Sequence, residues 1–141
     1  AWTLDRSGNR QEVTQTERIG SLLNGTVRVI EGRGYTADGT AGFQALGVVS
    51  YDVATKKWSM RSWAQGRSGD FPFVPTTDGF TWTTPAGPNA TVRYTAVIKG
   101  DVWREVGEYL AHGREPRQIF EMNLRRIATT KWPEEGAIPM Q

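Results

Sequence analysis

The chain has 141 residues, 38% of them hydrophobic and 16 of them glycine, which fits one folded domain and excludes a largely disordered chain. It has no cysteine, which excludes disulfide scaffolds, thiolate metal sites and cysteine nucleophiles. The 17 basic and 15 acidic residues are interleaved and leave a net charge of +2, so we expect no nucleic-acid partner. No apolar run approaches the roughly 18 residues of a helical span, so we also expect no membrane span.

The chain starts at Ala1, without a methionine and without a basic-then-apolar leader. Two explanations stay open. Either a signal peptide has been removed, as in a periplasmic or secreted protein, or the chain has been shortened.

Turn residues recur at short, even intervals, and the residues between them alternate with the period of a β-strand. Gly8 lies in the first turn, where a positive φ costs glycine little. A single helical turn is expected at 21–25, ended by Asn24 and Gly25. The strands expected in the first half cover 2–5, 10–18, 26–32, 42–51 and 57–65.

The same rhythm continues through the second half of the chain. Pro72 places the strand around it at an edge or rim, because proline cannot donate a ladder hydrogen bond. Lys99, Gly100 and Asp101 are expected to form a tight hairpin. The strands expected here cover 70–74, 80–84, 90–98, 102–111 and 118–127, and 128–141 is expected to be a C-terminal tail that lies across the domain or extends away from it.

About ten strands with short connections predict an antiparallel meander in one domain, residues 1–127. Closure into a barrel removes the exposed edges of such a sheet. A two-sheet sandwich is the alternative, but it normally needs long crossover loops, and no loop here exceeds about eight residues. We therefore predict an all-β, about ten-stranded antiparallel barrel.

Several strand segments resemble one bacterial family. They are VIEGRGY at 29–35, GVVSYD at 47–52, RYT at 93–95, WREVGE at 103–108 and FEMNLRR at 120–126. The family is a group of uncharacterised lipocalin-like β-barrels, a domain of unknown function, and the resemblance covers residues 1–127. It implies a calycin-type barrel with a central cavity and brings no established activity. Such proteins usually open with a Trp-x-Gly-x-Gly strand, whereas this chain has AWTL at 1–4, so the first strand is expected to be short.

Two late strands have faces that mix large apolar side chains with charged ones. Mixed faces are typical of an enclosed pocket that carries a few polar groups among aromatic residues. The alternative is a cross-strand ion pair, Glu105–Arg125 or Glu108–Arg126. The two mixed faces are Trp103, Glu105, Gly107 and Tyr109 on one strand, and Phe120, Met122, Leu124 and Arg126 on the next.

The chain has 6 tryptophans, 4 tyrosines and 5 phenylalanines, and most lie in expected strands. Filling the interior is reason enough for them, but ten strands also enclose more space than side chains fill, which leaves room for an apolar ligand. An interior arginine, one of Arg93, Arg104, Arg125 and Arg126 depending on register, would then pair with a carboxylate head group. The candidate cavity residues are Trp58, Met60, Phe73, Trp82, Tyr94, Trp103, Glu105, Tyr109, Phe120, Met122 and Arg126.

Catalytic signals are few. Nothing pairs a nucleophile with a base at a readable spacing, so we expect no enzyme, and Glu105 with Glu121 is only a weak candidate for acid–base chemistry. His112 is the single histidine, which excludes multi-histidine metal sites. It is expected to be a solvated turn residue, and the alternative role is an axial haem ligand.

The sequence thus predicts a carrier that holds a hydrophobic or amphipathic small molecule inside the barrel, with no cofactor, as a monomer or homodimer. Two alternatives stay open. One is a haem-binding barrel through His112, and the other is a filled barrel that acts as an interaction or structural protein.

Overall fold

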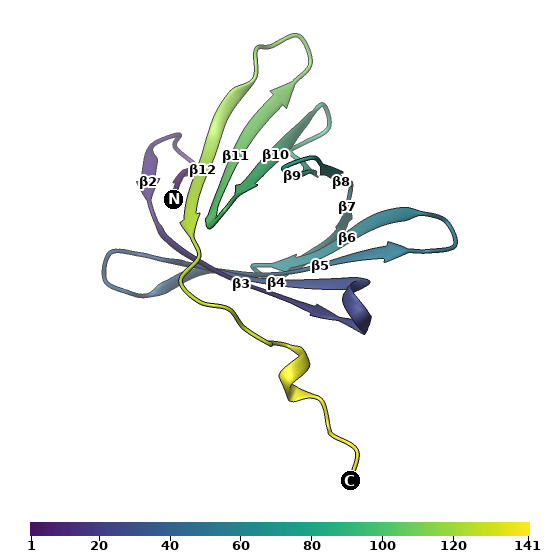
Figure 1. The fold of residues 1–141 in the computed structure, drawn as a ribbon. Helices are drawn as coiled ribbons and strands as arrows, with labels where there is room; N and C mark the ends of the chain where they lie inside the picture. Colours follow the sequence, from purple (N-terminus) through teal and green to yellow (C-terminus); the bar gives the residue numbers. More distant parts are fainter.

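The computed structural model describes all of residues 1–141 and consists of two antiparallel β-sheets that face each other (Figure 1). Its only helical segments are the 3₁₀ turns η1 (Leu23–Gly25) and η2 (Glu134–Gly136). Neither has the length or the apolar character that a membrane crossing would need.

The larger sheet has seven strands, in the spatial order β2-β1-β12-β11-β10-β9-β8. They are β1 (Trp2–Leu4), β2 (Arg10–Glu12), β8 (Phe73–Thr76), β9 (Gly79–Pro85), β10 (Ala90–Lys99), β11 (Val102–Ala111) and β12 (Arg117–Arg125). The smaller sheet has five strands, in the order β3-β4-β5-β6-β7. They are β3 (Thr14–Leu22), β4 (Val27–Tyr35), β5 (Ala41–Asp52), β6 (Lys57–Ala64) and β7 (Arg67–Phe71).

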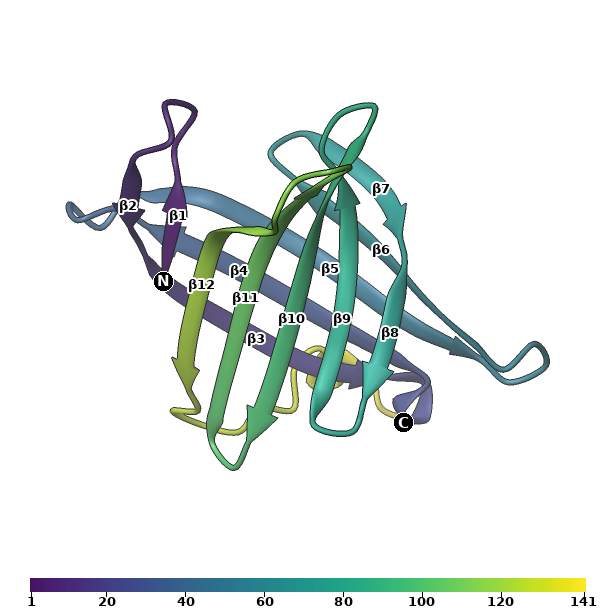
Figure 2. The ribbon, with the colours of Figure 1, turned by 90° about the horizontal axis from the view of Figure 1, so that it is seen from above.

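The two sheets are joined at two corners, where the chain leaves one sheet and enters the other (Figure 2). Val13 separates β2 from β3, and Pro72 separates β7 from β8. Proline has no N–H to donate, which interrupts the ladder at the second corner. No strand of one sheet pairs with a strand of the other, so hydrogen bonds do not close the structure into a barrel.

The closed barrel expected from the sequence is therefore not formed. Two packed sheets are usually connected by long crossover loops. Here a single residue at each corner redirects the chain, as happens where strands switch sheets through a bend. The all-β class and the antiparallel pairing of neighbouring strands are confirmed.

Each of the ten expected strand ranges overlaps a strand, although β4 runs on to Tyr35 and β7 begins at Arg67. The count rises to twelve because the ranges 10–18 and 70–74 are each divided at a corner. The hairpin at Gly100 joins β10 to β11, and the expected helical turn is η1. Gly8 has a φ of 82°, the left-handed conformation that its turn requires.

The interior is incompletely filled. Only 12 of the 141 residues are buried, and no large side chain is completely enclosed. A small core of Ala96, Trp103 and Met122 packs against Phe80 and Phe120 of the seven-stranded sheet. A domain of this size with a solid core buries far more residues than this, so the space between the sheets must hold a void.

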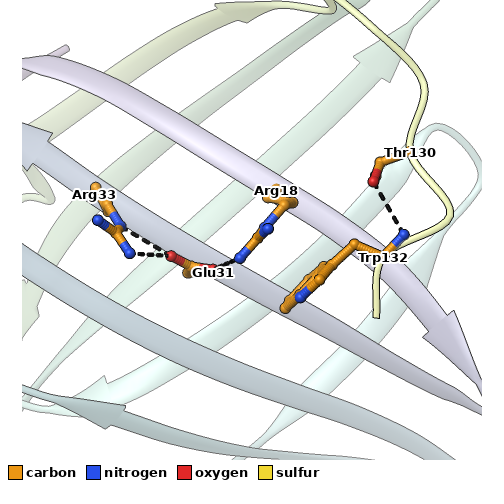
Figure 3. Close-up of polar contacts among 5 residues, drawn as sticks. All are labelled: Arg18, Glu31, Arg33, Thr130 and Trp132. Atoms are coloured by element: carbon orange, nitrogen blue, oxygen red, sulfur yellow. Dashed lines mark hydrogen bonds and ion pairs between the residues drawn. The ribbon is translucent and has the colours of Figure 1, made fainter. Parts of the chain in front are cut away.

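The C-terminal tail crosses the outer face of the five-stranded sheet (Figures 1 and 2). There the Arg18 guanidinium of β3 lies 4.1 Å from the centre of the Trp132 ring. Arg18 and Arg33 both donate to the carboxylate of Glu31, while Thr130 accepts a hydrogen bond of 3.0 Å from the Trp132 backbone (Figure 3). Beyond Pro133 the tail is exposed and extends away from the domain (Figure 1), so each of the two expected paths describes part of it.

Candidate functional site

A cavity of about 340 Å³ lies between the two sheets. This is room for roughly ten water molecules at about 30 Å³ each. Of the 21 residues that line it, 14 are hydrophobic. The lining residues are Ala1, Trp2, Thr3, Val13, Gln15, Glu17, Ile30, Gly32, Phe43, Ala45, Gly47, Met60, Ser62, Ala64, Phe80, Trp82, Tyr94, Trp103, Glu105, Phe120 and Met122.

The seven-stranded sheet supplies an aromatic wall. Trp82 of β9 stacks on Tyr94 of β10, with ring centres 4.2 Å apart and planes 13° from parallel. Tyr94 meets Phe120 edge-on at 5.9 Å. Gly107 of β11 lies between these two rings, because a Cβ there would stand 2.9 Å from Tyr94 and 3.0 Å from Phe120. A glycine at this position lets both rings approach the cavity.

The five-stranded sheet supplies small residues, which is why the space opposite the aromatic wall stays open. Gly32, Ala45 and Ala64 lie in one cross-strand row over β4, β5 and β6. Gly47 and Ser62 face each other in the next row. None of these side chains is long enough to reach the other sheet. The space stays open because the pairing register places small residues side by side in these two rows.

Glu105 of β11 is the one buried charged or polar residue, with 5% of its surface exposed. Its two carboxyl oxygens accept hydrogen bonds from two indole rings, Trp82 Nε1 at 3.0 Å and Trp103 Nε1 at 3.2 Å. Burial raises the pKa of Glu105 above its usual range, and the two indole hydrogen bonds oppose that rise. Both oxygens keep a lone pair that these indoles do not use.

Glu17 of β3 brings a second carboxyl group to the cavity. It lies over Gly32, whose ideal Cβ would stand 2.7 Å from Glu17 Oε1, and it accepts a 2.8 Å hydrogen bond from Gln15 Nε2. Burial raises the pKa of Glu17 to about 7, against the hydrogen bond from Gln15 and with help from the charges of Glu105 and Glu31. The cavity thus holds two carboxyl groups, and the charge of Glu105 helps to raise the pKa of Glu17.

No arginine, lysine or histidine lines the cavity. The expectation that one of four arginines points inward is wrong, because all four are exposed. Arg93 pairs with Glu108 at 2.9 Å, Arg104 with Glu121 at 3.1 Å and Arg126 with Asp101 at 3.8 Å, while Arg125 lies opposite Val102 at the end of β11.

Seven of the eleven candidate cavity residues line the cavity: Met60, Trp82, Tyr94, Trp103, Glu105, Phe120 and Met122. The other four, Trp58, Phe73, Tyr109 and Arg126, do not. Trp58 and Phe73 meet at 6.2 Å, and Phe73 stacks on Phe80 at 5.0 Å, so these two rings extend the aromatic wall beyond the cavity. Tyr109 lies near the end of β11, past the aromatic wall.

The alternative pairings of the late strands are not formed. Glu105 lies opposite Met122 rather than Arg125, and Glu108 pairs with Arg93 rather than Arg126. Glu121 points to the outer surface, where it pairs with Arg104, whereas Glu105 points inward. The two carboxyl groups are therefore on opposite faces of the sheet and cannot act together as acid and base.

His112 lies in the exposed loop between β11 and β12, outside the residues that line the cavity. This position does not fit an axial ligand for a haem held between the sheets.

Sequence reasoning missed Glu17 and Gln15, which lie in the strand expected over 10–18. A signal was present, because Val13, Gln15, Glu17 and Ile19 share one face of that strand. Two apolar residues bracketing two polar ones on one face indicate a partly polar interior.

A second hollow, of about 520 Å³, is an open groove along β4, β5 and β6 that includes Glu31, Arg33 and Trp63. Only 4 of its 12 lining residues are hydrophobic, so it lacks the apolar enclosure of the inner cavity.

Comparisons with protein-family models, with curated proteins and with solved structures find no match for this chain.

Proposed function

We propose that the protein binds a hydrophobic or amphipathic small molecule in the cavity between its two sheets and holds it without transforming it. One observation carries the proposal: a partly open cavity of about 340 Å³ that is walled by aromatic side chains and contains a few inward-facing polar groups. This combination is the usual character of a small-molecule site.

The packing around the cavity supports the same proposal. Two rows of small residues leave the space open, although larger apolar residues at Ala45 or Ala64 would fill it and stabilise the domain. The filled interior considered as an alternative does not agree with this void or with the small number of buried residues. The resemblance to lipocalin-like proteins agrees with this proposal, because it implies a central cavity.

The test is a pair of substitutions on neighbouring residues of β5. Ala45 lines the cavity, and Leu46 lies on the opposite face of the strand with 36% of its surface exposed. Ala45→Phe puts a ring into the cavity, whereas Leu46→Phe puts the same ring on the outside. Calorimetric titration with phenylbutanol, a neutral amphiphile with on the order of ten non-hydrogen atoms, is the measurement, because that size suits the cavity.

We expect the unsubstituted protein and Leu46→Phe to bind phenylbutanol alike, and Ala45→Phe to lose binding by about tenfold or more. Native mass spectrometry of the purified protein adds an independent reading, since a co-purified amphiphile would identify the class of ligand. Equal binding by both variants, or no binding by any of the three proteins, would overturn the proposal.

A further inference from the structure

The cavity carries charged side chains among its mostly apolar walls. Its charged side chains are both acidic, Glu17 and Glu105, and no basic side chain lines it. Each carboxyl group is held by neutral donors, an amide for Glu17 and two indoles for Glu105. The structure therefore places two carboxyl groups among aromatic rings with no cationic side chain to balance them.

A cation is the chemical group that suits this arrangement. It would donate charge-assisted hydrogen bonds to carboxylate oxygens, and such bonds are about twice as strong as neutral ones. The aromatic rings that line the cavity offer a second attraction, because an uncovered face of such a ring attracts positive charge, although Trp82 and Tyr94 already cover one face of each other. An anionic head group would instead meet two acids, and the one positive group at the cavity, the amino group of Ala1, already donates one hydrogen bond to the carbonyl of Val13.

We infer that the ligand of the cavity is an amphipathic amine, whose apolar body packs against the aromatic wall and whose ammonium group lies between Glu17 and Glu105. This inference rests on the proposed function, because it specifies the ligand of the same cavity.

Binding of such a ligand is coupled to protons. The charged groups that act on Glu17 are Glu105 of β11 and Glu31 on the opposite face of β4, and Tyr94 and the amino group of Ala1 lie at the same cavity. The amino group of Ala1 donates to the carbonyl of Val13 at 2.9 Å. Glu31 is already paired with Arg18 and Arg33. An ammonium ion favours the ionised form of Glu17, so binding near neutral pH releases a proton from this carboxyl.

The experiment compares three probes that share one apolar body: phenylbutylamine, phenylbutanol and phenylbutyrate. Calorimetric titration of the intact chain gives the affinity for each. We expect the amine to bind about tenfold or more tightly than the alcohol, which is the scale of one charge-assisted hydrogen bond in a desolvated site, and the carboxylate to bind most weakly. Titrating the amine in two buffers that differ in ionisation enthalpy should show proton release.

Two variants assign the effect to the carboxyl groups. Glu105→Gln and Glu17→Gln keep the size of the side chain and remove its charge. Each should lower the ratio of amine affinity to phenylbutanol affinity by about tenfold, because only the amine carries the charge that the carboxyl group binds. Retained alcohol binding shows that a variant is folded, and Glu17→Gln keeps the test available if Glu105→Gln does not fold, since Glu17 is the less buried of the two.

The outcomes separate the two proposals. An amine preference that disappears in either variant supports the inference. Equal binding of alcohol and amine, or tighter binding of the carboxylate, overturns the inference and leaves the proposed function standing. Failure of all three probes to bind the unsubstituted chain overturns both.

Discussion

Glu17 and Glu105 are the residues at which the interior departs furthest from an apolar core. An ionised carboxyl between two sheets loses the solvation it has in water, and neutral hydrogen-bond donors restore only part of it. Two indoles hold Glu105, and one amide holds Glu17. Removing Glu105 would leave the indole N–H groups of Trp82 and Trp103 without this acceptor, and removing either indole would leave an oxygen of Glu105 without that donor. Either change lowers the stability of the fold, because an unpaired buried polar group has lost its solvation without compensation.

The raised pKa of Glu17 predicts a pH dependence of stability. Its pKa is about 7 in the folded chain against 4.5 for the free side chain, so the folded state binds more protons between these values. The free energy of unfolding therefore falls as the pH rises through this window. Glu17→Gln removes the ionisation. We expect its unfolding free energy, relative to the unsubstituted chain, to increase by about 2 kcal/mol from about pH 5 to about pH 8.

Urea unfolding at the two pH values measures this difference. Glu115→Gln is the matched control, since Glu115 lies in the exposed loop between β11 and β12 and should leave the pH profile unchanged. A profile for Glu17→Gln that runs parallel to that of the unsubstituted chain would show that Glu17 ionises normally in the folded state.

At the scale of single elements, β3 depends on a glycine to accept the C-terminal tail. The tail passes so close to Gly20 that a Cβ there would stand 1.6 Å from the carbonyl oxygen of Trp132. A methyl group at residue 20 would therefore fit only if the tail moved away from β3 or β3 left its place in the sheet. The stacking of Arg18 on Trp132 then holds the tail on this face, with the Glu31 carboxylate fixing Arg18 from the other side (Figure 3).

Gly20→Ala is therefore expected to detach the tail while both sheets stay folded. Limited trypsin digestion measures the effect, because Lys131 lies in the tail and is exposed. Cleavage after Lys131 should become several-fold faster in Gly20→Ala, since local opening controls proteolysis. Gly42→Ala is the control, because a Cβ at Gly42 meets its nearest atom at an ordinary 3.6 Å. Equal cleavage rates in the two variants would contradict this account of Gly20.

The strands could be predicted from the sequence because period-2 alternation and turn residues are local signals. The corners could not. Pro72 indicated an edge position, but proline marks a break in a ladder without showing that the chain then enters a different sheet. Val13 carries no turn signal, since its bend comes from the packing of the two sheets against each other.

At the scale of the whole molecule, the sequence predicted an enclosed interior with a few polar groups, but it did not show which ones. The face shared by Trp103 and Glu105 does point inward. Arg104 lies on the face shared with Val102 and Val106, which is apolar enough to have been the inner one. Only pairing across strands decides between such faces, and it also decides whether a ring such as Trp58 lies at the cavity or beyond it.

The division into two sheets predicts one cooperative unit rather than two. Most of the core lies on the inner face of the seven-stranded sheet, and aromatic contacts at one corner join that face to the five-stranded sheet. Phe71 of the five-stranded sheet meets Trp82 of the seven-stranded sheet edge-on at 6.2 Å, and Trp58 meets Phe73 across the same corner at 6.2 Å. A sheet that loses its partner exposes its whole apolar face, so we expect both sheets to unfold in a single transition.

Urea unfolding followed by far-ultraviolet circular dichroism and by tryptophan fluorescence tests this expectation, since both sheets contain tryptophan. The two signals should give the same midpoint. Phe71→Ala should lower the unfolding free energy by about 2 kcal/mol without separating the signals, because it removes a ring that joins the sheets. Val74→Ala, on an outward-facing residue with 56% of its surface exposed, should change stability by no more than about 0.5 kcal/mol. Separate midpoints for the two signals would mean that one sheet persists without the other, and the cavity between them would then have no single folded state to which a ligand binds.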